Sequence, residues 1–237
     1  MDSNTLFNEI RTFFSQNANP ENAERYKRYF REGFDAYGVA QELMFAKVKE
    51  TTKADYFSKP LAFELCRLLV PTGKYEETSF AAAMFIEMKK QFDRSYFDEV
   101  SHWFDIGIEN WAHTDYICGD IFAQLWKKEI ITLDDLSSWR ISDRKFKRRA
   151  VPVSMLKLLK LTKDFEPLLE FINPMMMDTE RVVHQGLGWF LREAWKRQPE
   201  PIEEFLLKWK NSAPRLIFQY ATEKMDKEYR LKFRKEK

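Results

Sequence analysis

The chain has 237 residues, of which 44% are hydrophobic and 16% aromatic, enough for one large domain or one repeat array with a sizeable core. A net charge of +2 is too mild to indicate a nucleic acid partner by itself, so that argument depends on local clusters. Two cysteines exclude a disulfide framework, and no apolar run reaches the roughly 20 residues that span a bilayer. The first residues lack a secretion-signal pattern, so we expect an intracellular, cytoplasmic protein.

Helix signals follow one another from the N-terminus, separated by proline and by a few glycines. Residues 4–16 have the apolar period of an amphipathic helix. Asn19 is the expected cap of a second helix that begins at Pro20. A third helix is expected over roughly 40–50 and a fourth over 61–70, where a proline and a glycine end it. The N-terminal third is therefore predicted to be helical throughout.

A repeat follows these helices. Five segments open with small or polar residues and continue with bulky apolar ones; they begin at Ser79, Asp115, Arg148, His184 and Pro214, at spacings of 36, 33, 36 and 30 residues. Shorter helical stretches lie between them, over 95–106, 132–140, 163–172 and 199–209. A helix pair recurring at this interval is the signature of a HEAT-like α-solenoid, whereas evenly spaced helices of an ordinary bundle are the alternative.

We therefore predict an all-α fold, a HEAT-like α-solenoid in which antiparallel helix pairs stack into a curved superhelix. The chain is expected to form a single domain over 1–237. Its parts are N-terminal helices to residue 73, a repeat array over 74–224, and a basic C-terminal helix or tail over 225–237. The C-terminal basic residues are mixed with acids, so this last segment is expected to fray in solvent.

One stretch, Trp103 to Asp120, holds an acidic residue where the helical pattern requires an apolar one. Apolar residues along and after it fall on one helix face, at Phe104, Ile108, Trp111, Cys118, Phe122 and Leu125. The missing middle position is Asp115, one turn after Trp111. If the helix breaks before Trp111, Asn110 caps a new helix that begins there, and both residues still project from the same side. A buried carboxylate is costly unless it is paired or used, so Asp115 is a candidate functional residue.

The strongest local charge is the run from Arg144 to Arg149, in which five of six residues are basic. Ser142 and Asp143 precede it as expected caps, so the run occupies a first helical turn, where the helix dipole disfavours cations. Such runs are usually solvated surface. Here the position against the dipole indicates an external anion, and phosphate is the obvious candidate.

Seven tryptophans are many for this length. Five of them fit core or inter-helix packing, at Trp103, Trp126, Trp139, Trp195 and Trp209. Trp111 is set apart by its neighbour Asp115, and Trp189 by two preceding glycines, Gly186 and Gly188, which let another group approach the helix closely. Arg192 follows Trp189 by about one turn on a similar face.

At these positions the chain resembles the HEAT-like-repeat alkylpurine DNA glycosylases, the AlkD-like DNA alkylation repair family. Four pieces carry the resemblance, and their order covers most of the chain: Ala23-Glu24 through Tyr29 to Tyr37-Gly38-Val39; Trp111-x-x-x-Asp115; Trp139-x-x-Ser142-Asp143 running into Arg149-Ala150; and Gly188-Trp189-x-Leu191-Arg192-Glu193. One departure follows Gly38-Val39, where family members often carry a polar residue, a proline and arginines, and this chain reads Ala40 to Met44. Fewer DNA-facing groups are expected there.

The resemblance implies a role for each matching residue. Asp115 corresponds to the family's catalytic aspartate, and Trp111 and Trp189 to the tryptophans that flank the damaged nucleotide. Arg149 corresponds to a residue that contacts the DNA backbone, and Arg192 is expected to contact it too. The basic run adds Lys147 and Arg148 as candidate phosphate ligands.

The chemistry of alkylpurines is consistent with this set. An N3- or N7-alkylated purine is a cation whose glycosidic bond is weak, and its departure leaves an oxocarbenium-like sugar. One carboxylate can stabilise that charge, and indole faces attract a cationic base. No acid, metal, cofactor or lysine nucleophile is required, so the expected enzyme is a monofunctional glycosylase that excises these purines from double-stranded DNA and leaves an abasic site.

Two other functions fit the same residues. The first is a non-catalytic HEAT-repeat scaffold that binds DNA structures or proteins, in which Asp115 only caps or pairs within the core. The second is a glycosylase-derived protein that binds branched or damaged DNA without cutting it. The retained Asp115 with Trp111 and Trp189 favours the enzyme, expected to be a monomer associated with the nucleoid through DNA binding and not with a membrane.

Overall fold

The computed structural model describes residues 1–31 and 33–236. They form two compact units, Met1–Gln124 and Leu125–Lys237. Helices make up both units, and in the described residues the one strand-like contact is an isolated bridge between Asp35 and Lys74, so the all-α prediction is confirmed. None of the described helices has the length and apolar character needed to cross a bilayer. The predicted divisions at residues 73 and 224 stay predictions.

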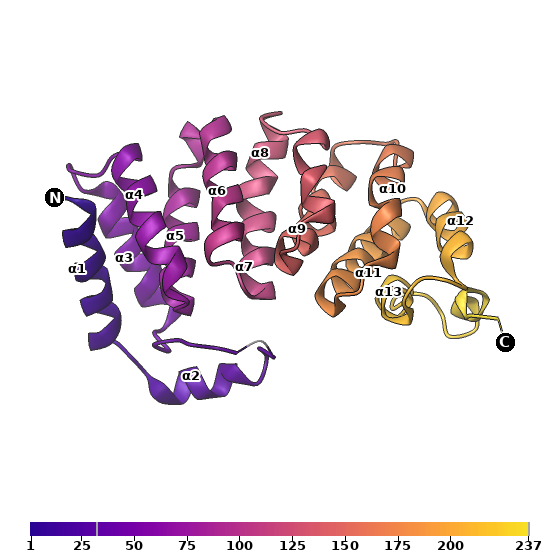
Figure 1. Cartoon of the computed structure of the whole chain (residues 1–237), viewed down its shortest axis with the longest axis horizontal. Coiled ribbons are helices and arrows are strands. Elements are labelled where there is room, and N and C mark those ends of the chain that lie inside the picture. The colour runs from indigo at the N-terminus through magenta and orange to yellow at the C-terminus, as the bar shows by residue number, and fades with distance from the viewer. Residues whose placement is uncertain (32, 237) are drawn as a thin grey trace. The chain divides into compact units, whose positions relative to one another are not determined.

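The first unit contains seven helices that lie wholly within it, and an eighth that begins at its end (Figure 1). In order these are α1 (Ser3–Gln16), α2 (Pro20–Lys27), α3 (Gln41–Lys53), α4 (Lys59–Leu69), α5 (Tyr75–Glu87), α6 (Arg94–Ile106), α7 (Trp111–Tyr116) and α8 (Ala123–Lys127). The side chain of Asn19 accepts a hydrogen bond from the backbone of Asn22, and Pro20 occupies the first turn, as predicted for α2. A π-helical turn, Ile117–Phe122, joins α7 to α8.

Helix α5 is the core of this unit, because ten consecutive residues, Glu76–Phe85, are buried. Three alanines in its middle, Ala81 to Ala83, leave room for close neighbours. Helices α3, α4 and α7 and the π-turn all pack against it. A helix buried on every side has no polar face, which is why the sequence gives α5 no amphipathic period.

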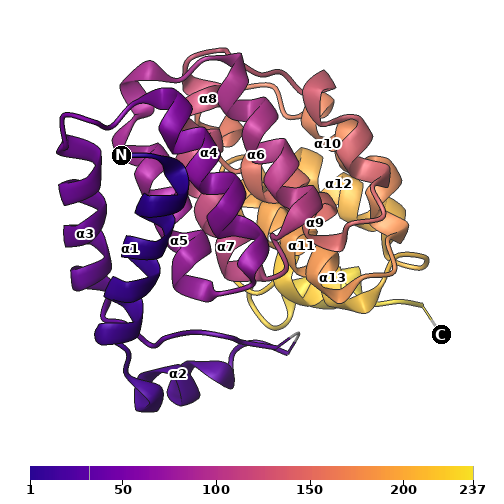
Figure 2. The ribbon, with the colours of Figure 1, turned by 60° about the vertical axis from the view of Figure 1, so that its left-hand side comes forward.

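Helix α2 lies apart from the other helices of the first unit, at the bottom of both ribbon views (Figures 1 and 2). The chain that follows it is held to α5 by one carboxylate. Glu76 accepts hydrogen bonds from the backbone N–H groups of Tyr37, Gly38 and Val39, at 2.9, 2.7 and 3.1 Å. Gly38 has φ +77°, and a Cβ there would lie 2.0 Å from the carbonyl oxygen of Asn19. The segment before α3 therefore has a fixed path.

The second unit is built around five helices, α9 (Lys145–Met155), α10 (Glu166–Ile172), α11 (Arg181–Trp195), α12 (Pro199–Trp209) and α13 (Arg215–Ala221). Short 3₁₀ segments connect them, at Asp134–Leu136, Ser138–Ile141, Leu158–Lys160, Asn173–Met177 and Tyr229–Phe233. The helix expected over 132–140 is therefore wrong in type: it consists of two 3₁₀ turns. The clustering of Ser and Asp in this stretch favours turns over a continuous α-helix.

Helix α11 packs between α9 and α13, and two glycines allow both contacts. A Cβ on Gly186 would meet Pro152 and Arg149 of α9 at 3.3 to 3.4 Å. A Cβ on Gly188 would lie 2.4 Å from Cβ of Tyr220 on α13. Positions two apart on a helix point in nearly opposite directions, so each glycine serves one neighbour. The close approach predicted at these glycines is confirmed, and the approaching groups are helices.

The repeat predicted from the sequence corresponds to five of these helices. Helices α5, α7, α9, α11 and α13 begin at Tyr75, Trp111, Lys145, Arg181 and Arg215. The first four begin three or four residues before the expected starts, and α13 begins one residue after its expected start. Each expected start was placed at the first small or polar residue of its segment. In the first four segments the first helical turn precedes that residue, because helix ends are set by capping contacts that an apolar pattern does not reveal.

The C-terminal segment folds back on the second unit and does not fray as expected. The side chain of Phe233 is fully buried. Lys232 and Tyr229 both bond to the carboxylate of Glu203 on α12, at 2.6 and 2.8 Å. The side chain of Asn211 accepts from the backbone N–H of Glu236 at 3.0 Å. Aromatic residues among the charges supply the burial that a polar tail lacks.

Candidate functional site

Helix α7 carries Trp111 and Asp115, and both of its ends are defined by local structure. Asn110 caps it, accepting from the backbone N–H of His113 at 2.8 Å, so the break before Trp111 is confirmed. The π-turn after Tyr116 closes its hydrogen bonds one residue later than an α-helix does. The regular period is interrupted at both points, so the apolar residues on either side of α7 do not form one stripe with it.

Asp115 and Trp111 consequently lie at the edge of the buried face. From Trp111 through the π-turn to the start of α8, the buried residues are His113, Thr114, Ile117, Cys118, Ile121, Phe122, Ala123 and Leu125. Asp115 is half-buried and Trp111 is 37% exposed. Trp111 is thus not a core residue, contrary to its place in the predicted stripe. The carboxylate of Asp115 is thus only partly enclosed.

The indole of Trp111 is fixed by the segment that follows α2. Its Nε1–H donates to the carbonyl oxygen of Tyr29 at 3.2 Å. Its ring stacks on Phe30, with centroids 5.5 Å apart and planes at 15°. Phe30 in turn stacks on Phe34, and both contact Tyr75. These supporting rings could not be predicted from local sequence patterns, because Trp111 lies about 80 positions after Tyr29 and Phe30.

A buried histidine fixes α7 to α5. Nδ1 of His113 lies 2.8 Å from the Asn110 amide, and Nε2 lies 3.0 Å from the Tyr75 carbonyl oxygen. The ring also stacks on Tyr75 at 4.5 Å. Desolvation by burial lowers the pKa of His113 to about 4. The ring is therefore neutral at pH 7, with Nδ1 accepting and Nε2–H donating, and it has no role as a cation.

This burial makes stability depend on pH. Because the folded pKa of His113 lies near 4 and the unfolded value near 6.5, the stabilisation is complete above pH 6.5 and is lost as the pH falls towards 4. The expected loss is about 3 kcal/mol of unfolding free energy over that window. Urea unfolding from pH 7 to 4 measures it. His113→Gln should remove this part of the pH dependence, whereas His102→Gln, at an exposed position, should leave it unchanged.

The basic run lies at the start of α9, where its members differ in exposure. Lys147 is half-buried, with its ammonium 5.1 Å above the Trp139 ring. Arg148 forms a two-pronged pair with Asp178, at 2.6 and 3.2 Å, and only 14% of its side chain is exposed. Arg149 is 5% exposed and donates to the Val182 carbonyl oxygen at 2.7 Å. These two arginines join α9 to the chain entering α11.

The expected caps of α9 are only partly correct. Ser142 accepts from the backbone N–H of Arg144, one residue before the helix, and no side chain caps the helix itself. A phosphate contact for Arg149 stays a prediction. The burial of Arg149 does not favour such a contact. Phosphate binding by Lys147 and Arg148 also stays a prediction. Arg148 would have to break its ion pair with Asp178 to reach a phosphate.

Trp189 and Arg192 lie on α11, as predicted, one turn apart. Trp189 is half-buried. Arg192 bonds to Glu193 at 3.0 Å and to Glu223 near α13, and its side chain is 17% exposed. The candidate residues are thus divided: Trp111 and Asp115 belong to the first unit, and the remaining five, Lys147, Arg148, Arg149, Trp189 and Arg192, to the second.

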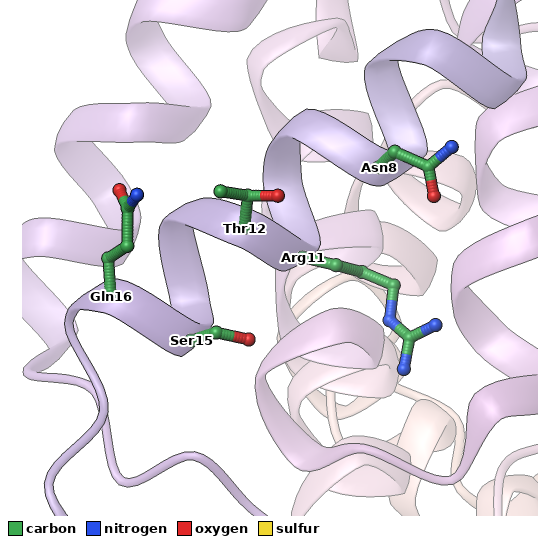
Figure 3. Close-up of a pocket in the computed structure, with 5 residues that line it drawn as sticks. All are labelled: Asn8, Arg11, Thr12, Ser15 and Gln16. Carbon is green, nitrogen blue, oxygen red and sulfur yellow. The ribbon is translucent and has the colours of Figure 1, made fainter.

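A shallow polar depression lies along α1, away from these residues in the sequence. Figure 3 shows its lining side chains, Asn8, Arg11, Thr12, Ser15 and Gln16. Its cation, Arg11, pairs with the buried carboxylate of Glu77 at 3.2 Å. Since the depression is lined from one helix face and its charge is neutralised, we assign it no chemistry.

In the described residues no three His, Cys, Asp or Glu side chains gather in a way that could hold a metal ion.

Comparison with known proteins identifies the family. The sequence profile of the family described as DNA alkylation repair enzyme matches residues 10–225. Among solved structures, the chain is similar to a protein described as a predicted DNA alkylation repair enzyme from Enterococcus faecalis, with a TM-score of 0.69 and 17% identity over 89% of this chain and 97% of that one. It is also similar to AlkD2 from Streptococcus mutans, with a TM-score of 0.57 and 16% identity over 87% and 99% of the two chains.

At these identities the structural likeness concerns the fold, and the predicted helical-repeat class is confirmed. A comparison with curated proteins finds no match. The family match spans most of the chain and includes every candidate residue on α7, α9 and α11. The chain therefore belongs to the DNA alkylation repair enzyme family and has a role in DNA alkylation repair.

Proposed function

We propose that the protein is a monofunctional DNA glycosylase that removes positively charged N3- and N7-alkylpurines from double-stranded DNA. The observation that supports this most is the pair on α7. A half-buried carboxylate, Asp115, follows by one turn a partly exposed indole whose position is fixed by a hydrogen bond and a stacked ring. A planar cation can stack on the part of Trp111 that Phe30 does not cover, a contact worth about 0.5–2 kcal/mol.

The proposed reaction breaks the bond between C1′ and the purine nitrogen. Both bonding electrons go to the purine, which leaves as a neutral base because the alkyl group had made it a cation. The sugar becomes an oxocarbenium-like cation, and water then adds to C1′ and releases one proton. Asp115 stabilises the cation by its charge and can accept the proton from the water. A single carboxylate suffices, because the leaving group needs no protonation.

The second unit is proposed to contribute DNA contacts. Lys147 is half-buried at the start of α9 and is proposed to contact a phosphate, and Arg192 and Arg148 would exchange their carboxylate partners for phosphates. Trp189, half-buried on α11, is proposed to contact the damaged nucleotide, as the family resemblance implies. The protein is proposed to act as a monomer on duplex DNA.

The test is incubation of the purified protein with methylated duplex DNA at neutral pH. The expected result is release of free 7-methylguanine and 3-methyladenine, measured by chromatography, with an equal number of abasic sites and no strand breaks. Uracil in the same duplex should not be released, because a neutral base lacks the weakened bond. Tight binding of methylated or branched DNA without base release would instead support the scaffold alternative.

A further inference from the structure

A second basic site lies at the C-terminal end of the second unit. Its cavity, of about 250 Å³, is lined by Arg215 and Gln219 of α13, by Thr222 directly after α13, and by Arg230 and Arg234 farther along the chain. Residues four apart share one face of a helix, so Arg215 and Gln219 point the same way from α13. The volume is below the roughly 300–1,000 Å³ of pockets for drug-sized ligands, so a small group fits best.

All the charged side chains that line this cavity are cationic. The lining contains three arginines and no acid. No ion pair joins any of the three to a carboxylate within residues 1–31 and 33–236, in contrast to Arg148 and Arg192. Burial and the neighbouring Arg234 and Arg230 lower the pKa of Arg215, with no acidic group acting against them. Gathering like charges costs free energy, which a bound anion would recover.

Contacts within the second unit hold the two segments that line the cavity. Arg215 donates to the carbonyl oxygen of Phe233 at 3.0 Å, and the ring of Phe233 is fully buried. Tyr229 and Lys232 bond to Glu203, which fixes the 3₁₀ turn that carries Arg230. The fold therefore brings the two segments together, and the side chains of Arg215 and Arg234 are exposed and accessible to a ligand.

We propose that Arg215, Arg230 and Arg234 form a phosphate-binding pocket that receives a backbone phosphate of duplex DNA. The guanidinium groups supply the planar donors that suit a tetrahedral oxyanion, and the exposed amide of Gln219 adds a donor. The assignment of the phosphate to DNA rests on the proposed function, whereas the pocket itself does not.

The test compares two double variants of the full chain. Arg230→Gln with Arg234→Gln removes two cations of the pocket and keeps Arg215, which also bonds to the backbone. Lys227→Gln with Lys235→Gln removes the same charge from the same segment outside the lining. Binding to an undamaged duplex without terminal phosphates is measured by fluorescence anisotropy over a range of KCl concentrations. Thermal unfolding with and without inorganic phosphate is measured in parallel.

The arginine variant is expected to bind the duplex about tenfold more weakly than the lysine variant, the loss of one charge-assisted contact. Its salt slope should be shallower by about 1, because each neutralised phosphate contributes about 0.9. Its thermal stabilisation by inorganic phosphate should be lost. Base release is measured separately, on the unsubstituted protein, so failure of this site and failure of the glycosylase are separate results.

Two outcomes would overturn parts of the proposal. If both variants match in duplex binding, salt slope and response to phosphate, the pocket does not bind phosphate. If the arginine variant binds duplex like the lysine variant but alone loses its response to inorganic phosphate, the pocket takes a small free phosphate and the assignment to DNA is wrong.

Discussion

Replacing Asp115 with asparagine is expected to lower the rate of 7-methylguanine release by about 10²- to 10³-fold, the usual effect of removing one preorganised electrostatic group from an active site. The amide has nearly the same shape as the carboxylate but no charge, so it neither stabilises the oxocarbenium-like sugar nor accepts the proton from water. Duplex binding should remain, since phosphate contacts dominate affinity. Single-turnover release from methylated duplex and anisotropy on the same duplex measure the two effects.

Asp120→Asn is the matched control. Asp120 lies on the π-turn that continues α7, and it is exposed. The same substitution there removes the same charge from the same continuous segment, so a general electrostatic effect would appear in both variants. Equal rates for Asp115→Asn and the unsubstituted protein would show that Asp115 does not take part in excision. Equal losses in both variants would indicate that only net charge matters.

The structure around Asp115 was partly predictable because its start signal is local. Asn110 lies three residues before the backbone N–H that it caps, so a cap followed by an apolar run suffices to place the beginning of α7. The near-regular recurrence of helices could also be predicted, because each repeat places small residues at similar positions. Local patterns thus predicted the helical-repeat class and the helix that carries the acid.

Long-range contacts around the site could not be read from the sequence. The rings that fix Trp111 come from the segment after α2, and Glu76 holds that segment through three backbone N–H groups. The π-turn was also missed, and together with the break at Asn110 it interrupts the regular period that placed Trp111 on the buried face. A period analysis assumes an unbroken helix, so it fails where hydrogen bonding changes.

The basic run on α9 illustrates a different limit. Five cations in six residues, placed against the helix dipole, predict an external anion such as phosphate. For Arg148 the structure supplies an internal anion, Asp178, thirty residues later in the sequence. Asp178 also accepts from the backbone N–H of Glu180 at 2.8 Å, just before α11 begins. The pair therefore joins the start of α9 to the start of α11.

This buried pair leads to the second large effect. Arg148→Ala is expected to lower the free energy of unfolding by about 3–5 kcal/mol, because removing one partner leaves the carboxylate of Asp178 buried without its cation. The side chain of Asp178 is only 6% exposed, so water cannot replace the guanidinium. Urea unfolding at pH 7 measures the loss. Lys147→Ala, on the same helical turn but half-buried, should cost less than about 1 kcal/mol.

A structural role and a DNA contact for Arg148 make different predictions for the double variant Arg148→Met with Asp178→Leu. Replacing both charges by apolar groups of similar size removes the unpaired carboxylate, so most of the stability lost in Arg148→Ala should return. If Arg148 only fixes α9 against α11, duplex affinity should return as well. If affinity stays low and the salt slope is shallower by about 1 while stability is restored, Arg148 leaves Asp178 to bind a phosphate when DNA is present. Lack of recovery in stability would show instead that the pair is not the source of the loss.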